Sequence, residues 1–244
     1  MNRTARIAIT AGLALMGSAA ITNADTVEVR YTGVGLNRII NVSGTVFSGG
    51  VYAGELNHDF RNGNGLASSL TGIIKTFCTE LRQHVTASWR VFDLQDVEDA
   101  PVPGPAMGSV KAQAIANIVA GAAGNEHLSQ NYAAAFQMMV WEIVHDYDGT
   151  QASINIGAGS VRFSSGNAYF GGVGGVADLF NNTLKTMIDD PNAAFGGLRA
   201  VTNAYYQDQL VTVSLPVVVP VPAPVMMGAA GLVGVAYLRR RMGR

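Results

Sequence analysis

Apolar and polar residues alternate along several stretches in the first part of the chain, and many of these residues are β-branched. A period of two with this composition predicts β-strands. We expect strands at 26–31, 38–47, 51–55 and 86–94, and later in the chain at 152–156, 160–163 and 209–215. The sequence Ser48-Gly49-Gly50 favours a tight turn between the second and third strands.

The middle of the chain has a helical period instead. We expect helices at 110–123, 129–147 and 175–187. The second is the longest: Ser129 is a suitable N-cap and Gly149 can end it in a left-handed conformation. Its predicted buried stripe consists of Tyr132, Phe136, Val140, Ile143 and Tyr147.

Strands followed by helices and a closing strand predict an α+β fold. Within that class we expect an antiparallel β-sandwich or barrel with a helical insertion. The single folded domain should cover residues 25–215, preceded by residues 1–24 and followed by residues 216–244, which have a different composition.

The N-terminus has the pattern of a secretory signal peptide. Arg3 and Arg6 precede the apolar stretch 7–21, and Thr22-Asn23-Ala24 is a small-residue cleavage sequence. These features occur in the order that export signals require, so we expect cleavage before Asp25. A buried N-terminal helix is the alternative.

The C-terminus has a second tripartite pattern. A valine- and proline-rich segment at 217–224 leads into an apolar stretch at 225–238, which is followed by Arg239, Arg240 and Arg241. As a helix the apolar stretch would span about 21 Å, at about 1.5 Å per residue, whereas a bilayer core is about 30 Å thick. This length favours a transient inner-membrane association. An ordinary short membrane tail is the alternative.

Composition narrows the classes of function. All 17 acidic residues lie in the expected mature part, together with 10 of the 16 basic residues, so its net charge is −7. An acidic surface with few lysines argues against nucleic-acid binding and is compatible with a solvated extracellular protein. We expect no cofactor and no metal.

The only cysteine is a candidate for chemistry. An exported chain with an odd cysteine calls for an explanation, and one explanation is an internal thioester between the Cys78 sulfur and the Gln137 side-chain carbonyl. Such a bond needs protection from water, which Phe77, Phe136 and Trp141 could provide; Trp141 follows Gln137 by one helical turn. The alternatives are an inert buried thiol at Cys78 and a surface position for Gln137.

These motifs resemble known families. Phe77-Cys78, followed by Phe136-Gln137-Met138-Met139-Val140-Trp141, resembles the thioester domains of bacterial surface adhesins, and Val51-Tyr52-Ala53-Gly54-Glu55-Leu56 is similar to their early strand. The C-terminus resembles the PEP-CTERM sorting signal of Gram-negative bacteria, although Pro222-Ala223-Pro224 replaces the usual Pro-Glu-Pro.

The resemblance implies an exported protein of the cell envelope or extracellular space. It also implies processing by an enzyme of the exosortase type. The thioester would attach the protein covalently to an amine or hydroxyl on a surface or matrix protein or polysaccharide. Adhesion of this kind would not make the protein an enzyme.

Two other classes of function remain open. The first is a non-covalent structural protein of the extracellular or biofilm matrix, in which Cys78 is inert. The second is a cysteine hydrolase, in which Cys78 would need a base. The candidate partners for that reaction are His84, His127 and His145, with Asp146.

Overall fold

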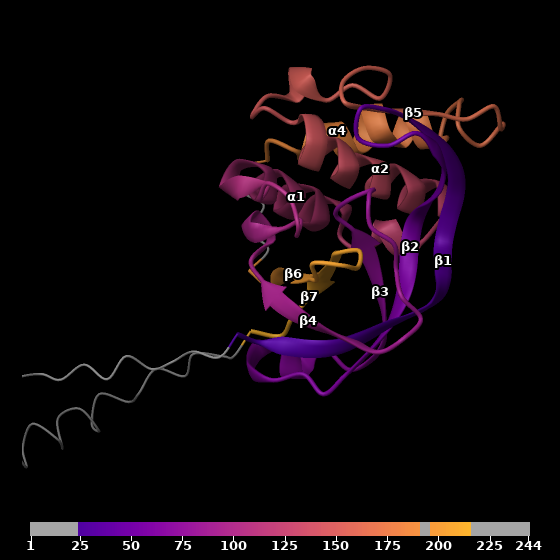
Figure 1. Cartoon of the computed structure of the whole chain (residues 1–244). Helices are drawn as coiled ribbons and strands as arrows, with labels where there is room; N and C mark the ends of the chain where they lie inside the picture. Colours follow the sequence, from indigo (N-terminus) through magenta and orange to yellow (C-terminus); the bar gives the residue numbers. More distant parts are fainter. Residues whose placement is uncertain (1–23, 191–195, 216–244) are drawn as a thin grey trace, which may run out of the picture.

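A computed structural model describes residues 24–190 and 196–215 of the chain (Figure 1). The predicted signal sequence up to residue 23 and the predicted sorting tail, with Pro222, Ala223, Pro224 and Arg239–Arg241, lie outside the described residues. Helices gather on one side of a β-sheet whose longest strand curves around the molecule (Figure 1). The predicted α+β class is confirmed, since the sheet is antiparallel and the helices are segregated from it.

Seven strands form the sheet. They are β1 (Thr26–Gly44), β2 (Gly49–Arg61), β3 (Gly72–Cys78), β4 (Arg90–Gln95), β5 (Val161–Ser164), β6 (Leu198–Thr202) and β7 (Gln209–Thr212). Their order is β2-β3-β7-β6-β4-β1-β5, and β2 also pairs with β1. The pairings therefore return to their starting strand and close a ring of six strands, with β5 attached to the far end of β1.

β1 is one continuous strand where the hydrophobic pattern predicts two. Its first residues pair with β4 and its last residues pair with β5, while β2 runs beside most of its length. The register with β2 shifts between Val34 and Asn37, opposite Gly54, which has a φ of +139°. A bulge at this point bends the strand without ending it, and this interruption is what the alternation pattern misses.

The helices follow β4. They are α1 (Gly108–Ala122), α2 (Gln130–Asp146), and a later helical segment made of α3 (Val176–Asp178), a π-helical stretch (Leu179–Leu184) and α4 (Lys185–Met187). Ser129 caps α2 as expected, because its hydroxyl accepts a hydrogen bond from the Tyr132 backbone N–H at 3.2 Å. Every residue of α2 from Ala133 to Val144 is buried, so α2 is a central helix and the predicted single buried stripe is too narrow.

Two strands and one turn differ from the sequence prediction. β3 and β6 are missed because neither alternates strictly between apolar and polar residues; their strand partners on both sides define them. The predicted strand at 152–156 is wrong, since Gln151–Ser153 forms a 3₁₀ turn. The Lys185 ammonium donates a hydrogen bond to the Ile154 carbonyl at 2.6 Å, which fixes this turn against the later helical segment.

Two groups of buried side chains hold these elements together. The larger lies between the sheet and the helices and includes most of α2; the smaller joins side chains of β1, β2, β4, β6 and β7. Within the described ranges, none of the helices combines the length and apolar character that crossing a bilayer requires.

Candidate functional site

The candidate site lies where the end of β3 meets the middle of α2. Cys78 is the last residue of β3 and pairs with Gln209 of β7. Gln137 lies at the centre of α2, which packs against β1, β2 and β3. The fold therefore brings together two residues that are 59 positions apart in the sequence.

The Gln137 carboxamide makes two hydrogen bonds to the main chain of Cys78. Its Oε1 accepts from the Cys78 backbone N–H at 2.9 Å, and its Nε2 donates to the Cys78 carbonyl oxygen at 2.7 Å. Both residues are buried, Gln137 completely and Cys78 to 4 % exposure. Because Gln137 is completely buried, the alternative of a surface position for it is wrong. The Cys78 sulfur is attached through one carbon to the backbone that the Gln137 amide contacts.

Aromatic rings surround this contact. Phe77 and Phe136 precede Cys78 and Gln137 in sequence, and their ring centroids are 4.7 Å apart. Trp141 is 1 % exposed and stacks on Phe163, with centroids 6.1 Å apart and an interplanar angle of 20°. The three residues expected to shield the site are thus all buried.

The Cys78 thiol is in a strongly apolar environment. Burial raises its pKa well above the ordinary range, and the negative charge of Glu80 adds to this effect. The Trp141 indole N–H acts in the opposite direction and favours the thiolate. That N–H faces the sulfur and has no other hydrogen-bond partner among the described residues.

Two of the candidate partners in the hydrolase hypothesis, His127 and Asp146, bond to residues other than Cys78. His127 bonds to Glu55, and Asp146 accepts hydrogen bonds from the backbone N–H groups of Ser160 and Val161 at 2.9 and 3.0 Å. A raised thiol pKa also differs from the lowered value that activates catalytic cysteines.

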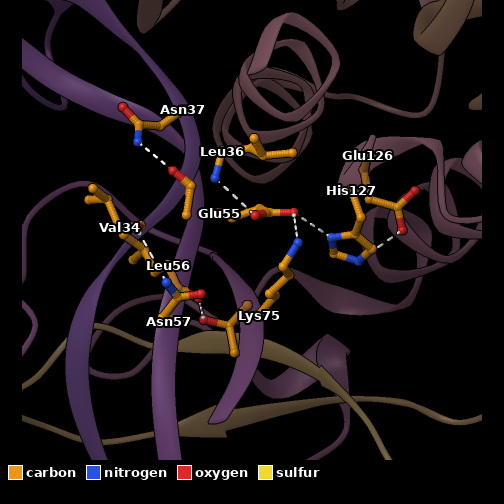
Figure 2. Close-up of polar contacts among 11 residues, drawn as sticks. Val34, Leu36, Asn37, Glu55, Leu56, Asn57, Lys75, Glu126 and His127 are labelled. Carbon is orange, nitrogen blue, oxygen red and sulfur yellow. Dashed lines mark hydrogen bonds and ion pairs between the residues drawn. The ribbon is translucent and has the colours of Figure 1, made fainter. Parts of the chain in front are cut away.

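A buried carboxylate cluster lies beside the site, and sequence patterns alone did not indicate it. Figure 2 shows the completely buried Glu55 at its centre. Glu55 accepts hydrogen bonds from the Leu36 backbone N–H at 2.9 Å, from Lys75 Nζ at 3.1 Å and from His127 Nδ1 at 2.7 Å. The His127 ring lies 5.8 Å from that of Phe77, so the cluster supports one wall around Cys78.

Glu55→Gln should lower the free energy of unfolding by about 2 kcal/mol at pH 7, because it removes charge-assisted hydrogen bonds. Burial by itself would raise the Glu55 pKa, but bonds from Leu36, His127 and Lys75 outweigh it and hold the pKa below its usual value. A lowered carboxyl pKa stabilises the fold above the unfolded pKa and is lost as pH falls through the folded one. The difference between the two proteins should therefore shrink below pH 4, in urea titrations at several pH values.

The matched control is Glu28→Gln, which changes a half-exposed carboxylate paired with Arg61 at 2.5 Å. Exposed pairs contribute little, so its effect should stay below about 1 kcal/mol. Equal losses for the two variants would show that Glu55 acts only as a surface charge.

Two further acidic residues near the site were also missed. Glu80 lies two residues after Cys78, and its Oε2 accepts hydrogen bonds from the Arg82 and Gln83 backbone N–H groups at 2.6 and 2.8 Å. Asp208 precedes β7 and accepts from the Val102 and Asn203 backbone N–H groups at 2.5 and 2.8 Å. Burial raises the pKa of Asp208 to about 7. Only the fold reveals the role of Asp208, since its partner Val102 is 106 positions away, whereas the partners of Glu80 are its neighbours in the chain.

The assembled site is a buried contact between the Gln137 carboxamide and the main chain of Cys78. In the parts of the chain that the structure describes, no group of three or more His, Cys, Asp or Glu side chains is arranged to hold a metal ion. Comparisons with protein-family models, with curated proteins and with solved structures found no match to this chain.

Proposed function

We propose that Cys78 and Gln137 form an internal thioester and that the protein uses it for covalent attachment to a target nucleophile. The observation that carries this proposal is the pair of hydrogen bonds by which the Gln137 carboxamide holds the Cys78 main chain. The two residue types that the bond requires are in contact, and both are buried from water.

The chemistry is an exchange of acyl partners. The Cys78 sulfur attacks the Gln137 side-chain carbonyl carbon, the carbon–nitrogen bond breaks, and ammonia leaves with the thiol proton. A target amine later attacks the same carbon, the carbon–sulfur bond breaks, and the sulfur takes a proton from the amine. The Trp141 indole N–H beside Cys78 is a donor that can stabilise negative charge on the sulfur.

The remaining parts of the proposal come from the sequence resemblance. In this view the protein is exported to the cell envelope or extracellular space of a Gram-negative bacterium, and an exosortase-type enzyme processes its C-terminus. The folded part is a barrel-like antiparallel sheet with a helical insertion that carries Gln137. Its target is an amine or hydroxyl on a surface or matrix component, and its function is adhesion.

A second candidate is a non-covalent matrix protein, and one observation favours it. The Gln137 amide is already satisfied by the Cys78 main chain, so no covalent bond is needed to compensate its burial. The raised thiol pKa also fits an inert cysteine.

The intact mass of the purified protein distinguishes the two candidates. A thioester makes the protein lighter than its sequence mass by one ammonia, and Cys78→Ala should restore the full mass expected for that variant. The full sequence mass in freshly prepared wild-type protein, together with a thiol that labels after denaturation without added amine, would exclude the thioester.

A further inference from the structure

Two asparagines in the turn that follows β2 each precede a glycine. They are Asn62, before Gly63, and Asn64, before Gly65, and the sequence contains no other Asn-Gly pair. An asparagine loses ammonia when the backbone nitrogen of the next residue attacks its side-chain carbonyl carbon, and glycine at that next position hinders the approach least. This turn is therefore a candidate site of spontaneous covalent modification.

The fold requires both glycines of the turn. A Cβ on Gly63 would collide with the carbonyl oxygen of Ala67, in the 3₁₀ turn Gly65–Ser69. Gly65 has a φ of +52°, and a Cβ there would collide with the Asp25 carboxylate. The close packing of this turn thus selects the residue type that makes the preceding asparagines reactive.

Asn64 is fixed firmly to the start of β1. Its Oδ1 accepts a hydrogen bond from the Thr26 backbone N–H at 2.7 Å, and its Nδ2 donates to the Thr26 hydroxyl at 3.3 Å. Its own backbone N–H donates to the Thr26 carbonyl oxygen at 3.0 Å. The Asn64 carboxamide therefore reaches the Gly65 nitrogen only by giving up hydrogen bonds at both its oxygen and its nitrogen.

Asn62 is held at one point of its side chain. Its Nδ2 donates a hydrogen bond to Glu28 Oε2 at 3.1 Å, while its Oδ1 has no hydrogen-bond partner among the described residues. The Gly63 backbone N–H also has none within the described part of the chain. Asn62 is exposed and has a φ of +55°, a left-handed conformation found in turns. The attacking nitrogen and the carbonyl under attack are thus free of competing bonds.

We propose that Asn62 is a site of spontaneous deamidation, with water as the co-reactant. The Gly63 backbone nitrogen attacks the Asn62 side-chain carbonyl carbon, the carbon–nitrogen bond of the carboxamide breaks, and ammonia leaves with the proton of the Gly63 N–H. The product is a five-membered succinimide ring. Water then opens either carbonyl of the ring, which gives aspartate or isoaspartate at position 62.

The modification should weaken the adjoining end of the sheet. Glu28 and Arg61 form the last recorded pair between β1 and β2, and Glu28 Oε2 accepts hydrogen bonds from both Arg61 Nε and Asn62 Nδ2. Deamidation replaces the donor beside Glu28 with a second carboxylate, and like charges at this spacing repel. We expect the modified protein to unfold at a lower urea concentration than the unmodified protein.

The rates at the two asparagines test the proposal. The full-length protein is incubated at mildly alkaline pH, and peptide mapping by mass spectrometry measures the exchange of ammonia for water at each site. A synthetic peptide with the sequence of residues 58–67 is the reference, because it lacks the bonds that the fold imposes. We expect similar rates at the two sites in the peptide. In the protein Asn62 should react about tenfold faster than Asn64, since only Asn64 gives up two side-chain hydrogen bonds to Thr26.

Three variants assign the effect to Asn62. Asn62→Gly suits the left-handed backbone and should remove the fast reaction. Asn167→Gly makes the same change at an exposed asparagine that precedes alanine, and it should leave the fast reaction intact. Asn62→Asp should reproduce, before any incubation, the lower urea midpoint of the modified protein; an unchanged midpoint would contradict the expected effect on the sheet.

Equal rates at Asn62 and Asn64 in the folded protein, or no reaction at Asn62 under conditions that convert the peptide, would overturn the proposal. A succinimide and a thioester each make the protein lighter by one ammonia, so the mapping is repeated on full-length Cys78→Ala, where no thioester can form. The Asn62 rate should match that of the wild type, which keeps this site independent of the proposed function. A rate that falls to that of Asn64 in this variant would also contradict the proposal.

Discussion

Methylamine should add to the wild-type protein at Gln137 and release a free thiol at Cys78 in the same event. A thioester carbonyl is electrophilic, and the amine takes the place of the sulfur on it. The mass of the Gln137 peptide should increase relative to the thioester form, and an alkylating reagent should label Cys78 only after amine treatment and unfolding. Because both residues are buried, addition should be slow in the native state and faster in mild denaturant.

The same treatment should lower stability without any change of sequence. A cross-link between these residues closes a loop of 59 positions and restricts the unfolded chain. If disulfide arithmetic applies, opening it costs about 4 kcal/mol. Urea unfolding of treated and untreated wild-type protein measures this difference directly.

Cys78→Ala is the control for both effects. It should neither add methylamine nor lose stability on treatment, since Gln137 is then an ordinary amide. Gln137→Ala is less informative, because it also removes two hydrogen bonds to the Cys78 main chain in every hypothesis. Methylamine addition to the Cys78→Ala variant at the same rate as to the wild type would contradict the thioester.

The free energy of unfolding should fall as pH rises from 7 to 8, and Glu142→Gln should remove most of this decline. Glu142 is completely buried; its Oε1 accepts from the Asn155 backbone N–H at 2.7 Å, and its Oε2 has no partner among the described residues. Burial raises its pKa to about 8. A carboxyl whose folded pKa is raised holds a proton that the unfolded chain releases, so stability falls with pH up to about 8 and is flat above it.

Other groups act in different pH windows. Burial lowers the pKa of His58 and of His145 to about 4, so these two residues make stability increase between about pH 4 and 6.5. Asp208 lowers stability as pH rises towards 7. The interval from pH 7 to 8 is thus the one in which Glu142 dominates, with a slope of up to about 1.4 kcal/mol per pH unit.

Chemical denaturation of the wild type and of Glu142→Gln between pH 5 and 9 measures this effect. The variant should gain about 2 kcal/mol on the wild type between these limits, after allowance for structural relaxation. Glu98→Gln, at an exposed site, should give a curve parallel to that of the wild type. Parallel curves for Glu142→Gln as well would show that Glu142 is ionised throughout this range.

The local patterns of the sequence determined much of the secondary structure. Period-two and helical stretches predicted the α+β class, and Ser129 marked the start of α2 correctly because an N-cap depends on its own neighbours in the chain. The same local patterns failed at β3 and β6, which do not alternate regularly and are defined by pairing with distant strands.

The candidate pair was also visible in the sequence, since Cys78 is the only cysteine and both residues have aromatic neighbours. Its geometry was not. A contact across 59 positions depends on how β3 packs against α2. The hydrogen bonds from Gln137 are made to the main chain of Cys78, and main-chain bonds cannot be predicted from the residue type at that position. The unpartnered Glu80 oxygen, the Glu55 cluster and the raised Glu142 pKa likewise follow from burial, and only tertiary packing decides which polar groups lose contact with water.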